Sequence, residues 1–285
     1  MSTHQDFILT LSCPDRTGIV YSVSGLLFEL GCNILDAQQF GDEETRRFFL
    51  RVHFDVPAET VVEQLRGRFA AIGDEYNMVW HVHDAQRRAR VLVLVSKQGH
   101  CLNDLLFRTQ SGQLPVDLVA VISNHPDFAA LAASHQVPFH HLPVSADNRA
   151  EQEQKILDLV QAERIDLVVL ARYMQILSPE LCAALADRAI NIHHSFLPSF
   201  KGARPYHQAH ARGVKIIGAT AHYVTTDLDE GPIIEQDVAR VDHSMSPDEL
   251  VRIGSDIESQ VLARAVRRHV EHRILRNGRR TVVFR

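Results

Sequence analysis

The stretch INIHHSFLPSFKGARPYHQA (190–209) ends an apolar run with the polar side chains of Asn191, His193 and His194. Asn191 and His193 alternate, so on a β-strand their side chains point to the same side. Two prolines and a glycine then turn the chain. Polar groups at such a strand end could ligate a metal, transfer protons or satisfy nearby backbone groups. The apolar runs on either side of this stretch predict the fold in which these side chains lie.

Further apolar runs of strand length alternate with helical segments in this part of the chain. Such runs are typical of parallel strands that are buried on both faces. The strand candidates are RVLVLVS (90–96), LVAVISN (118–124), IDLVVLARY (165–173), AINIHHS (189–195) and the alternating GATAHYVT (218–225), with helical segments near 101–110, 126–134 and 150–163. We predict an α/β domain with a doubly wound, mostly parallel sheet. Open sheets of this kind bind ligands beyond the carboxyl ends of their strands, where SKQGH, RYMQILS and NIHHS would meet.

The chain before residue 85 has a different pattern, which predicts a separate domain. Its order is βαββαβ, that of a ferredoxin-like unit. The strand candidates are 6–13, 32–40, 46–56 and 77–84, and the helix candidates are 19–30 and 58–72. The polar run 85–90 is the predicted linker between domains 1–84 and 91–285. The second domain is expected to end in a helix over 247–268 and a hairpin over 273–284, turned at Asn277-Gly278.

Composition excludes several classes of protein. The formal net charge of −5 argues against a primarily nucleic-acid-binding chain. The four cysteines, Cys13, Cys32, Cys101 and Cys182, form no C-x-x-C pair, so we expect reduced thiols. The first residues carry no signal sequence, and no apolar run approaches the roughly 18 residues of a membrane span. We expect a cytoplasmic protein that binds neither nucleic acid nor membrane.

A carboxylate-rich loop, TTDLDEGPIIEQ (225–236), could complete a site at the end of the 189–195 strand. If this loop folds back, Asp227, Asp229 or Glu230 could meet His193. An amide, an imidazole and a carboxylate would suit the attack of water or an amine on a carbonyl carbon. The amide would donate to the oxyanion, and the carboxylate would set the charge of the imidazole and position the nucleophile.

Three other interpretations of these residues stay open from spacing alone. His207 and His210 could share one face of a helix and bind a metal, although no H-E-x-x-H motif or cysteine supports a zinc site. Ser195 could be a nucleophile, although no G-x-S-x-G motif surrounds it. Asn191 and His193 could also satisfy only loop backbone groups.

The segments NIHHSFLPSFKGARPYHQA and GATAHYVTTDLDEGPIIEQ together resemble the formyltetrahydrofolate-dependent transferases. The resemblance is greatest to the formyltetrahydrofolate deformylases, in which an ACT domain precedes the transferase-like domain; CPDRTGIV and GCNI are similar to parts of such a domain. It covers essentially the whole chain and implies catalytic roles for Asn191, His193 and Asp229. It leaves His194, at a position where relatives often carry proline, without a role. The folate-binding residues that it implies are Met174, Gln175, Ile176, Leu177, Thr225 and Asp227.

The implied reaction is hydrolysis of formyltetrahydrofolate to tetrahydrofolate and formate, which would balance one-carbon pools and supply formate for purine synthesis. The folate substrate and water would be its partners, with no metal and no permanently bound cofactor. Water is favoured as the acceptor because bulky Lys97, Gln98 and His100 replace the small residues that cradle a phosphate in ribonucleotide-using relatives. The alternatives are a phosphoribosylglycinamide formyltransferase, another formyltetrahydrofolate-dependent formyltransferase, or a non-catalytic ACT-type amino-acid sensor.

The resemblance also implies regulation and assembly through residues 1–84. An ACT-like unit would bind a small amino acid at a backbone-rich corner, for which the candidates are Asp15, Gly18 and Asn33. Pathway reasoning points to glycine or methionine as the effector. Pairing of two such units would make the protein a homo-oligomer.

Overall fold

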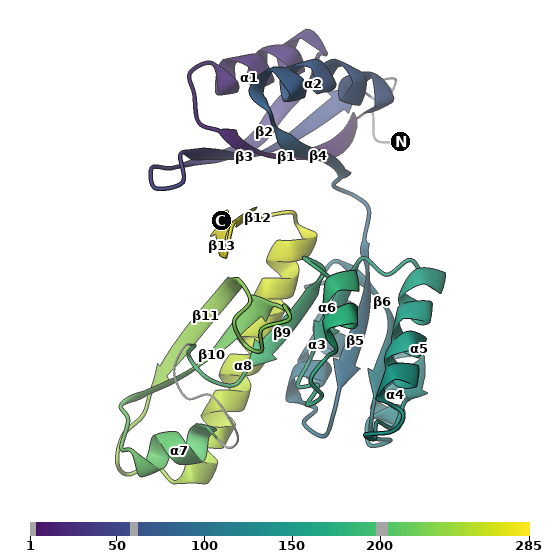
Figure 1. The fold of residues 1–285 in the computed structure, drawn as a ribbon, viewed down its shortest axis with the longest axis vertical. Coiled ribbons are helices and arrows are strands. Elements are labelled where there is room, and N and C mark those ends of the chain that lie inside the picture. The colour runs from purple at the N-terminus through teal and green to yellow at the C-terminus, as the bar shows by residue number, and fades with distance from the viewer. Residues whose placement is uncertain (1–3, 58–61, 198–204) are drawn as a thin grey trace. The chain divides into compact units, whose positions relative to one another are not determined.

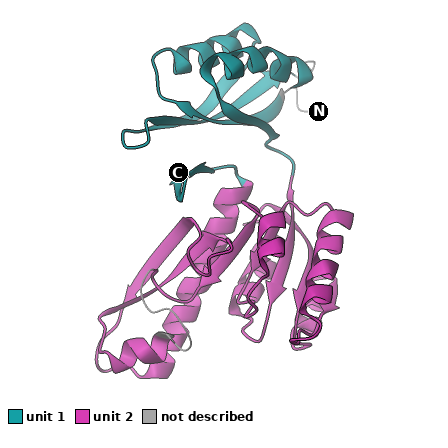
Figure 2. Cartoon of the chain, viewed as in Figure 1, with its two compact units in different colours: residues 1–87, 271–285 teal, residues 88–270 magenta. Residues whose placement is uncertain are grey.

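A computed structural model describes residues 4–57, 62–197 and 205–285. These residues form two compact units, 1–87 with 271–285 and 88–270 (Figure 2). Residues 58–61, the start of the second predicted helix, and 198–204, within the quoted stretch, lie outside the described residues.

The first unit is the predicted βαββαβ fold. Its elements are β1 (His4–Pro14), α1 (Ile19–Glu29), β2 (Asn33–Asp42), β3 (Arg47–Pro57), α2 (Val62–Tyr76) and β4 (Val79–Asp84). The antiparallel sheet has the order β2-β3-β1-β4, and both helices cover one of its faces (Figure 1). Leu9 and Leu11 of β1 alternate into the core and meet Phe54 and Phe69 there. The order of elements and the alternation of β1 were therefore predicted correctly.

The C-terminal segment completes this first unit. It forms the hairpin β12 (Ile274–Asn277) and β13 (Arg280–Val283). The side chain of Arg51 in β3 is only 4% exposed, because its guanidinium donates to the carbonyl of Glu271 at 3.1 Å and to Asp36 at 3.2 Å. The ring of His83 stacks on that of His272 at 3.6 Å. The sequence-based boundary put 271–285 in the second domain, whereas its contacts group it with residues 1–87.

The second unit is an α/β layer structure. Its strands are β5 (Ala89–Val95), β6 (Val116–Ser123), β7 (Phe139–His141), β8 (Leu167–Leu170), β9 (Ala189–His193), β10 (Ile216–Tyr223) and β11 (Ile233–Arg240). Its helices are α3 (His100–Gln110), α4 (Ala129–Ser134), α5 (Arg149–Ala162), α6 (Pro179–Ala184), α7 (Pro205–Ala211) and α8 (Pro247–Val270). The sheet order is β11-β10-β9-β8-β5-β6-β7, parallel from β9 to β7. The carboxyl ends of β5, β8 and β9 therefore lie side by side, as predicted.

Two strands of this sheet were not predicted. The strand β7 spans only three residues and carries two histidines, so it lacks the apolar run that marks a buried strand. The strand β11 was interpreted as the end of the 225–236 loop because its residues are half polar. It pairs antiparallel with β10, which is itself antiparallel to β9. The sheet is thus mostly parallel with an antiparallel end.

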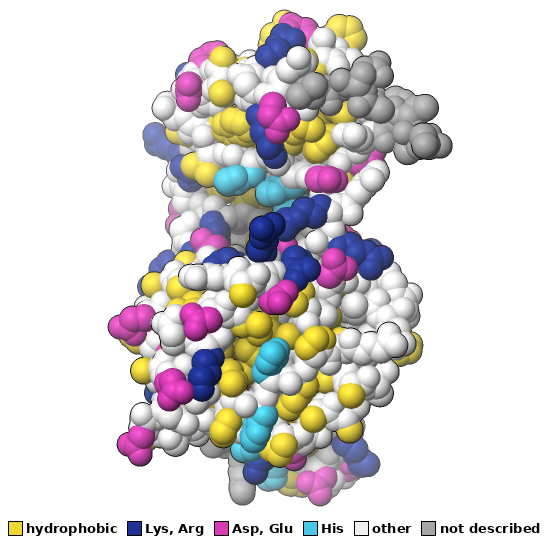
Figure 3. All heavy atoms as spheres, turned by 90° about the vertical axis from the view of Figure 1, so that its right-hand side faces the viewer, with side chains coloured by type: hydrophobic (Ala, Val, Ile, Leu, Met, Phe, Trp, Pro, Cys, Tyr) yellow, Lys and Arg dark blue, Asp and Glu magenta, His cyan; other side chains and the backbone are white. Residues whose placement is uncertain are grey.

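The surface carries charges of both signs. On the face drawn in Figure 3, lysine and arginine side chains lie among those of aspartate and glutamate. None of the described helices combines the length and the apolar content that crossing a lipid bilayer requires.

The burial of Arg51 predicts that it holds the C-terminal segment. We expect Arg51→Gln to lower the free energy of unfolding by about 1–3 kcal/mol, because a buried carbonyl loses its donors. Limited proteolysis should then cleave the 271–285 segment faster than in the wild type. Arg280→Gln is the matched control, since Arg280 is 55% exposed and its ion pairs with Asp42 and Glu44 contribute little. Equal cleavage rates in both variants would contradict this role of Arg51.

Candidate active site

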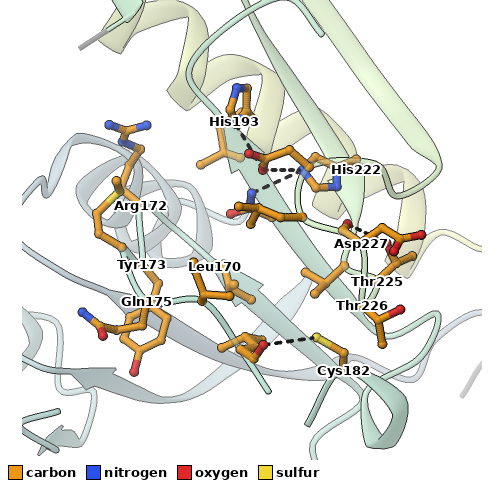
Figure 4. A pocket seen from close by; sticks show the side chains of 18 of the residues that line it. Leu170, Arg172, Tyr173, Gln175, Cys182, His193, His222, Thr225, Thr226 and Asp227 are labelled. Carbon is orange, nitrogen blue, oxygen red and sulfur yellow. Dashed lines mark hydrogen bonds and ion pairs between the residues drawn. The ribbon is translucent and has the colours of Figure 1, made fainter. Parts of the chain in front are cut away.

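The antiparallel pairing of β9 and β10 places the polar residues of the site. Asn191 of β9 lies opposite His222 of β10, and His193 lies opposite Thr220. Asn191 donates from its Nδ2 to Nε2 of His222 at 3.3 Å. The other ring nitrogen of His222, Nδ1, donates to the carbonyl of Tyr223 at 2.9 Å. The imidazole of His222 therefore has a fixed orientation, with Nε2 directed toward the site (Figure 4).

The loop between β10 and β11 returns to this strand end, as the sequence predicted. Gly231 lies so close to the carbonyl of Tyr223 that a Cβ atom would come within 1.7 Å of its oxygen. No residue with a side chain fits there, so glycine is required for the return. Asp229 has a φ of 56°, in the left-handed region that Asp and Asn tolerate best among residues with a side chain. This conformation turns its carboxylate toward the two histidines.

The carboxylate of Asp229 joins the two strands. Its Oδ1 lies 3.2 Å from Nδ1 of His193 and 3.7 Å from Nε2 of His222. Burial acts to raise the pKa of Asp229, but the hydrogen bond from His193 and the nearby ring of His222 outweigh it and hold that pKa well below its ordinary value. Asp229 is therefore a carboxylate at neutral pH and fixes the proton of His193 on the nitrogen that faces it.

The other ring nitrogen of His193 is available for chemistry. Nε2 of His193 is buried and has no hydrogen-bond partner among the described residues. His193 lines a cavity of about 280 Å³ together with Asn191, His222 and Asp229. A buried polar atom without a partner carries a free-energy cost, which a bound substrate or water can remove. An imidazole in this state, with a carboxylate behind it, can donate a proton to or accept one from a group in the cavity.

The predicted folate-binding residues line the same cavity from two sides. Met174, Gln175, Ile176 and Leu177 follow β8, and Thr225 and Asp227 come from the loop after β10. The side chains of Met174 and Ile176 are 59% and 58% exposed, so they are not core residues. Backbone N–H of Met174 donates to Oγ of Ser96 at 2.9 Å, which fixes the start of this segment. The two sides form an apolar slot that suits a planar ring.

Sequence reasoning left several residues of the cavity without a role, among them His222 and Arg172. His222 could have been found from the alternation of GATAHYV, which puts it on the same side of β10 as Thr220. Nothing in the sequence pattern marks Arg172, which follows the buried strand β8 at a φ of 64°. Its side chain is 7% exposed and forms an ion pair with Glu258 of α8 at 3.4 Å.

Among the described residues, one group of side chains has donor atoms close enough for a metal: His100, Cys101 and Glu258. Both carboxylate oxygens of Glu258 already accept hydrogen bonds, one from Tyr206 at 2.6 Å and one shared with His100 at 2.7 Å. The guanidinium of Arg172 beside them would repel a cation. This group does not fit a metal ion. The ring of His207 and that of His210, the residues considered for a metal from the sequence, are not part of it.

The candidate effector residues lie in the first unit and do not all come together. The carboxylate of Asp15 lies beside Gly41, near the end of β2. Gly18 begins α1 with a φ of 94° and packs against Tyr76. Asn33 begins β2 and is therefore at the opposite end of that strand from Gly41. The corner thus contains Asp15 and Gly18 but not Asn33 of the same chain.

Comparison with known proteins agrees with this site. A formyl transferase family model matches residues 89–266, and an ACT domain model matches residues 7–70. The chain is 48% identical over 286 residues to a formyltetrahydrofolate deformylase of Corynebacterium sp. (strain P-1), covering all of both chains. The chain belongs to the formyltetrahydrofolate deformylase family. The membership confirms the resemblance on which the sequence-based prediction rested.

Solved structures divide between deformylases and transferases. A formyltetrahydrofolate deformylase from Burkholderia mallei aligns with a TM-score of 0.94 and 55% identity over 99% of this chain and 100% of that chain. A glycinamide ribonucleotide transformylase from Symbiobacterium toebii aligns with a TM-score of 0.66 and 32% identity over 70% of this chain and 95% of that chain. The deformylase structure thus matches both units, and the transformylase matches a smaller part of the chain.

The lowered pKa of Asp229 predicts a pH-dependent contribution to stability. A carboxylate with a depressed pKa stabilises the fold fully above its unfolded pKa of about 4, and this contribution is lost as the pH falls toward the folded value. The loss in free energy of unfolding caused by Asp229→Asn should therefore be larger at about pH 5.5 than at about pH 3. Urea unfolding of the wild type and of Asp229→Asn at a series of pH values measures this difference in the free energy of unfolding.

The control for this measurement is Asp187→Asn. Asp187 is exposed and has a φ of 59°, close to that of Asp229, so the same substitution is made at the same backbone conformation. A difference between Asp229→Asn and wild type that stays constant from about pH 5.5 to 3 would show that the bond between His193 and Asp229 does not depress the pKa.

Proposed function

We propose that the protein hydrolyses formyltetrahydrofolate to tetrahydrofolate and formate. The observation that carries this proposal is the imidazole of His193, whose Nδ1 faces Asp229 at 3.2 Å and whose buried Nε2 has no partner among the described residues. Family membership supplies the substrate class. The apolar slot beside His193 supplies a binding site for the flat ring of a folate.

The residues around the cavity have distinct roles in this reaction. Oxygen of a water molecule attacks the formyl carbon and forms a tetrahedral oxyanion, and the bond from that carbon to the folate nitrogen then breaks. One water proton goes to the folate nitrogen, and the other is released as formic acid ionises to formate. His193 with a proton on Nε2, and the second N–H of Asn191 Nδ2, stabilise the oxyanion. Asp229 orients the water, takes the first water proton and passes it to the folate nitrogen, and offsets the charge of His193.

The pterin ring would lie between the Met174–Leu177 segment and the Thr225–Asp229 loop. Its faces would be covered by the apolar side chains of Ile176 and Leu177, and its edge would meet backbone groups of the two segments. The loop is held in shape by its own bonds, since Thr225 Oγ1 donates to the carbonyl of Asp227 at 3.0 Å. This placement brings the formyl group of a bound folate toward His193 and Asp229.

Asp229→Asn tests the mechanism. The substitution keeps the shape of the side chain but removes the base, so formate release should fall by about 100- to 10,000-fold. The Asp229→Asn variant should still bind a folate analogue, as measured by calorimetry. Asp187→Asn is the control for an equivalent change at an exposed turn. Near-normal turnover of Asp229→Asn would remove Asp229 from the mechanism.

The same assay separates the alternative functions. Formate release from formyltetrahydrofolate by the wild type, with no formylated product when glycinamide ribonucleotide is added, is expected of a deformylase. Formylated ribonucleotide formed at a comparable rate would make the protein a transferase. If neither formate nor formylated ribonucleotide forms, the remaining alternative is the non-catalytic amino-acid sensor.

Regulation and assembly belong to the first unit in this proposal. The edge strand β2 pairs only with β3 and leaves Ile34, Leu35 and Phe40 40–47% exposed, and α1 exposes Tyr21 and Phe28 by 81% and 83%. An open strand edge with apolar side chains is suited to pairing with a second copy. A homo-oligomer would form through these surfaces. Glycine or methionine would bind at the corner of Asp15 and Gly18 and change the rate at which the protein releases formate.

Gly18→Val tests the effector site. A Cβ atom at Gly18 would come within 2.9 Å of the Tyr76 hydroxyl, and its φ of 94° disfavours any side chain. We expect glycine or methionine to change formate release of the wild type by about 5- to 150-fold and to have no effect on the variant. Gly112→Val, at a φ of 76° with open space around it in the second unit, is the control. If neither amino acid changes the rate or binds in calorimetry, the first unit has only an assembly role.

A further inference from the structure

Arg172 occupies an unusual position at the catalytic edge of the sheet. It follows β8 in the left-handed backbone region, with a φ of 64°, and its carbonyl accepts from N–H of Ser96 at 3.2 Å. A long side chain in this conformation is strained, and such strain persists only where surrounding contacts hold it. The side chain is also buried, with 7% exposure. Both features indicate that the guanidinium is needed where it lies.

The guanidinium connects the segment after β5 to α8 through Gln98 and the buried carboxylate of Glu258. Nε of Arg172 donates to Oε1 of Gln98 at 2.8 Å and lies 3.4 Å from Oε2 of Glu258. Glu258 in turn accepts from the hydroxyl of Tyr206 at 2.6 Å and binds His100 at 2.7 Å. Gln98 and His100 are the bulky residues of the SKQGH segment. Both side chains thus form hydrogen bonds within the protein, to Arg172 and Glu258.

The same guanidinium fixes His194, the residue to which no role was assigned. Nη1 of Arg172 contacts Nδ1 of His194. Since a guanidinium has only donors, Nδ1 of His194 is the acceptor in this contact. Its ring stacks on that of His193, with centroids 5.0 Å apart and planes 19° apart. The network thus ends against the catalytic imidazole.

Arg172 and His194 line the same cavity as His193. In Figure 4, Arg172 lies toward His193, while Cys182 and Thr226 are at the other end of the cavity. A nucleophile must approach the formyl carbon from the side that the folate leaves free. Water needs little space there, whereas an amine with a substituent needs more, and Arg172 and His194 are among the residues that line this space.

We propose that Arg172, held by the buried carboxylate of Glu258, is a specificity-determining residue that closes the acceptor side of the site and so admits water in place of a substituted amine. The inference rests on the proposed function. In a transfer reaction the amine nitrogen would bond to the formyl carbon, the carbon–folate nitrogen bond would break, and one amine proton would pass to the folate nitrogen. The two reactions differ only in the nucleophile. The ratio of their products therefore measures how well a substituted amine, compared with water, reaches the formyl carbon.

Arg172→Gly is the decisive variant, because glycine adopts the left-handed conformation without strain and leaves the guanidinium volume open. The purified full chain is given formyltetrahydrofolate and glycinamide, and formate and N-formylglycinamide are both quantified. We expect the ratio of N-formylglycinamide to formate to rise by roughly tenfold or more over wild type. When hydroxylamine, which is hardly larger than water, replaces glycinamide, the ratio of formylated hydroxylamine to formate should rise less. A loss of stability alone would lower both products and leave their ratio unchanged.

Two further variants complete the experiment. Arg164→Gly is the control, since Arg164 is an exposed arginine with a φ of 50°, and its product ratio should equal that of wild type. Glu258→Gln keeps the shape of its side chain but removes the charge that holds Arg172, and it should raise the ratio in the same direction. If Arg172→Gly does not fold, the product ratio of Glu258→Gln tests the inference in its place. An unchanged ratio in a folded, formate-releasing variant overturns the inference, whereas absence of formate release by wild type overturns the proposed function and the inference with it.

Discussion

One carboxylate oxygen, Oδ1 of Asp229, holds the catalytic edge together. It lies within 3.7 Å of imidazoles on two neighbouring strands, His193 on β9 and His222 on β10. Its position depends on the left-handed backbone of Asp229 and on the contact between Gly231 and Tyr223, which brings the loop back to the sheet. Without this carboxylate, the ring of His193 would lose the bond that directs Nε2 into the cavity. The site is therefore built from strand register and loop return together.

A second set of buried charges lies beside the first and has a different character. Glu258 is 2% exposed, and burial alone would raise its pKa. The hydrogen bond from His100 and the charge of Arg172 outweigh that effect and hold the pKa below its ordinary value. Buried ion pairs rarely add much net stability, because the cost of desolvation offsets their attraction. Retaining one next to a catalytic histidine is better explained by the shape and charge that it gives to the cavity.

The sequence predicted most of the fold, and the physical reasons for its successes and failures differ. Buried parallel strands such as β5 and β8 are continuous apolar runs, so they were recognisable, as was the alternation of Asn191 and His193. The short edge strand β7 has no such pattern. The roles proposed for His193, Asn191 and Asp229 came from a resemblance, whereas spacing alone left other interpretations open. Arg172 was missed because its importance comes from a backbone angle and from partners up to 86 positions away along the chain, at Glu258.

The order of the two units along the chain has a consequence for biosynthesis. Residues 88–270 are inserted into the first unit, whose last part is the 271–285 segment. A ribosome therefore makes the sheet of β1–β4 first, but the carbonyl of Glu271 that Arg51 binds is made only after residues 88–270. Domains generally begin to fold during synthesis, starting from the N-terminus. Until residues 271–285 have been made, the nascent first unit carries an uncovered polar surface around Arg51.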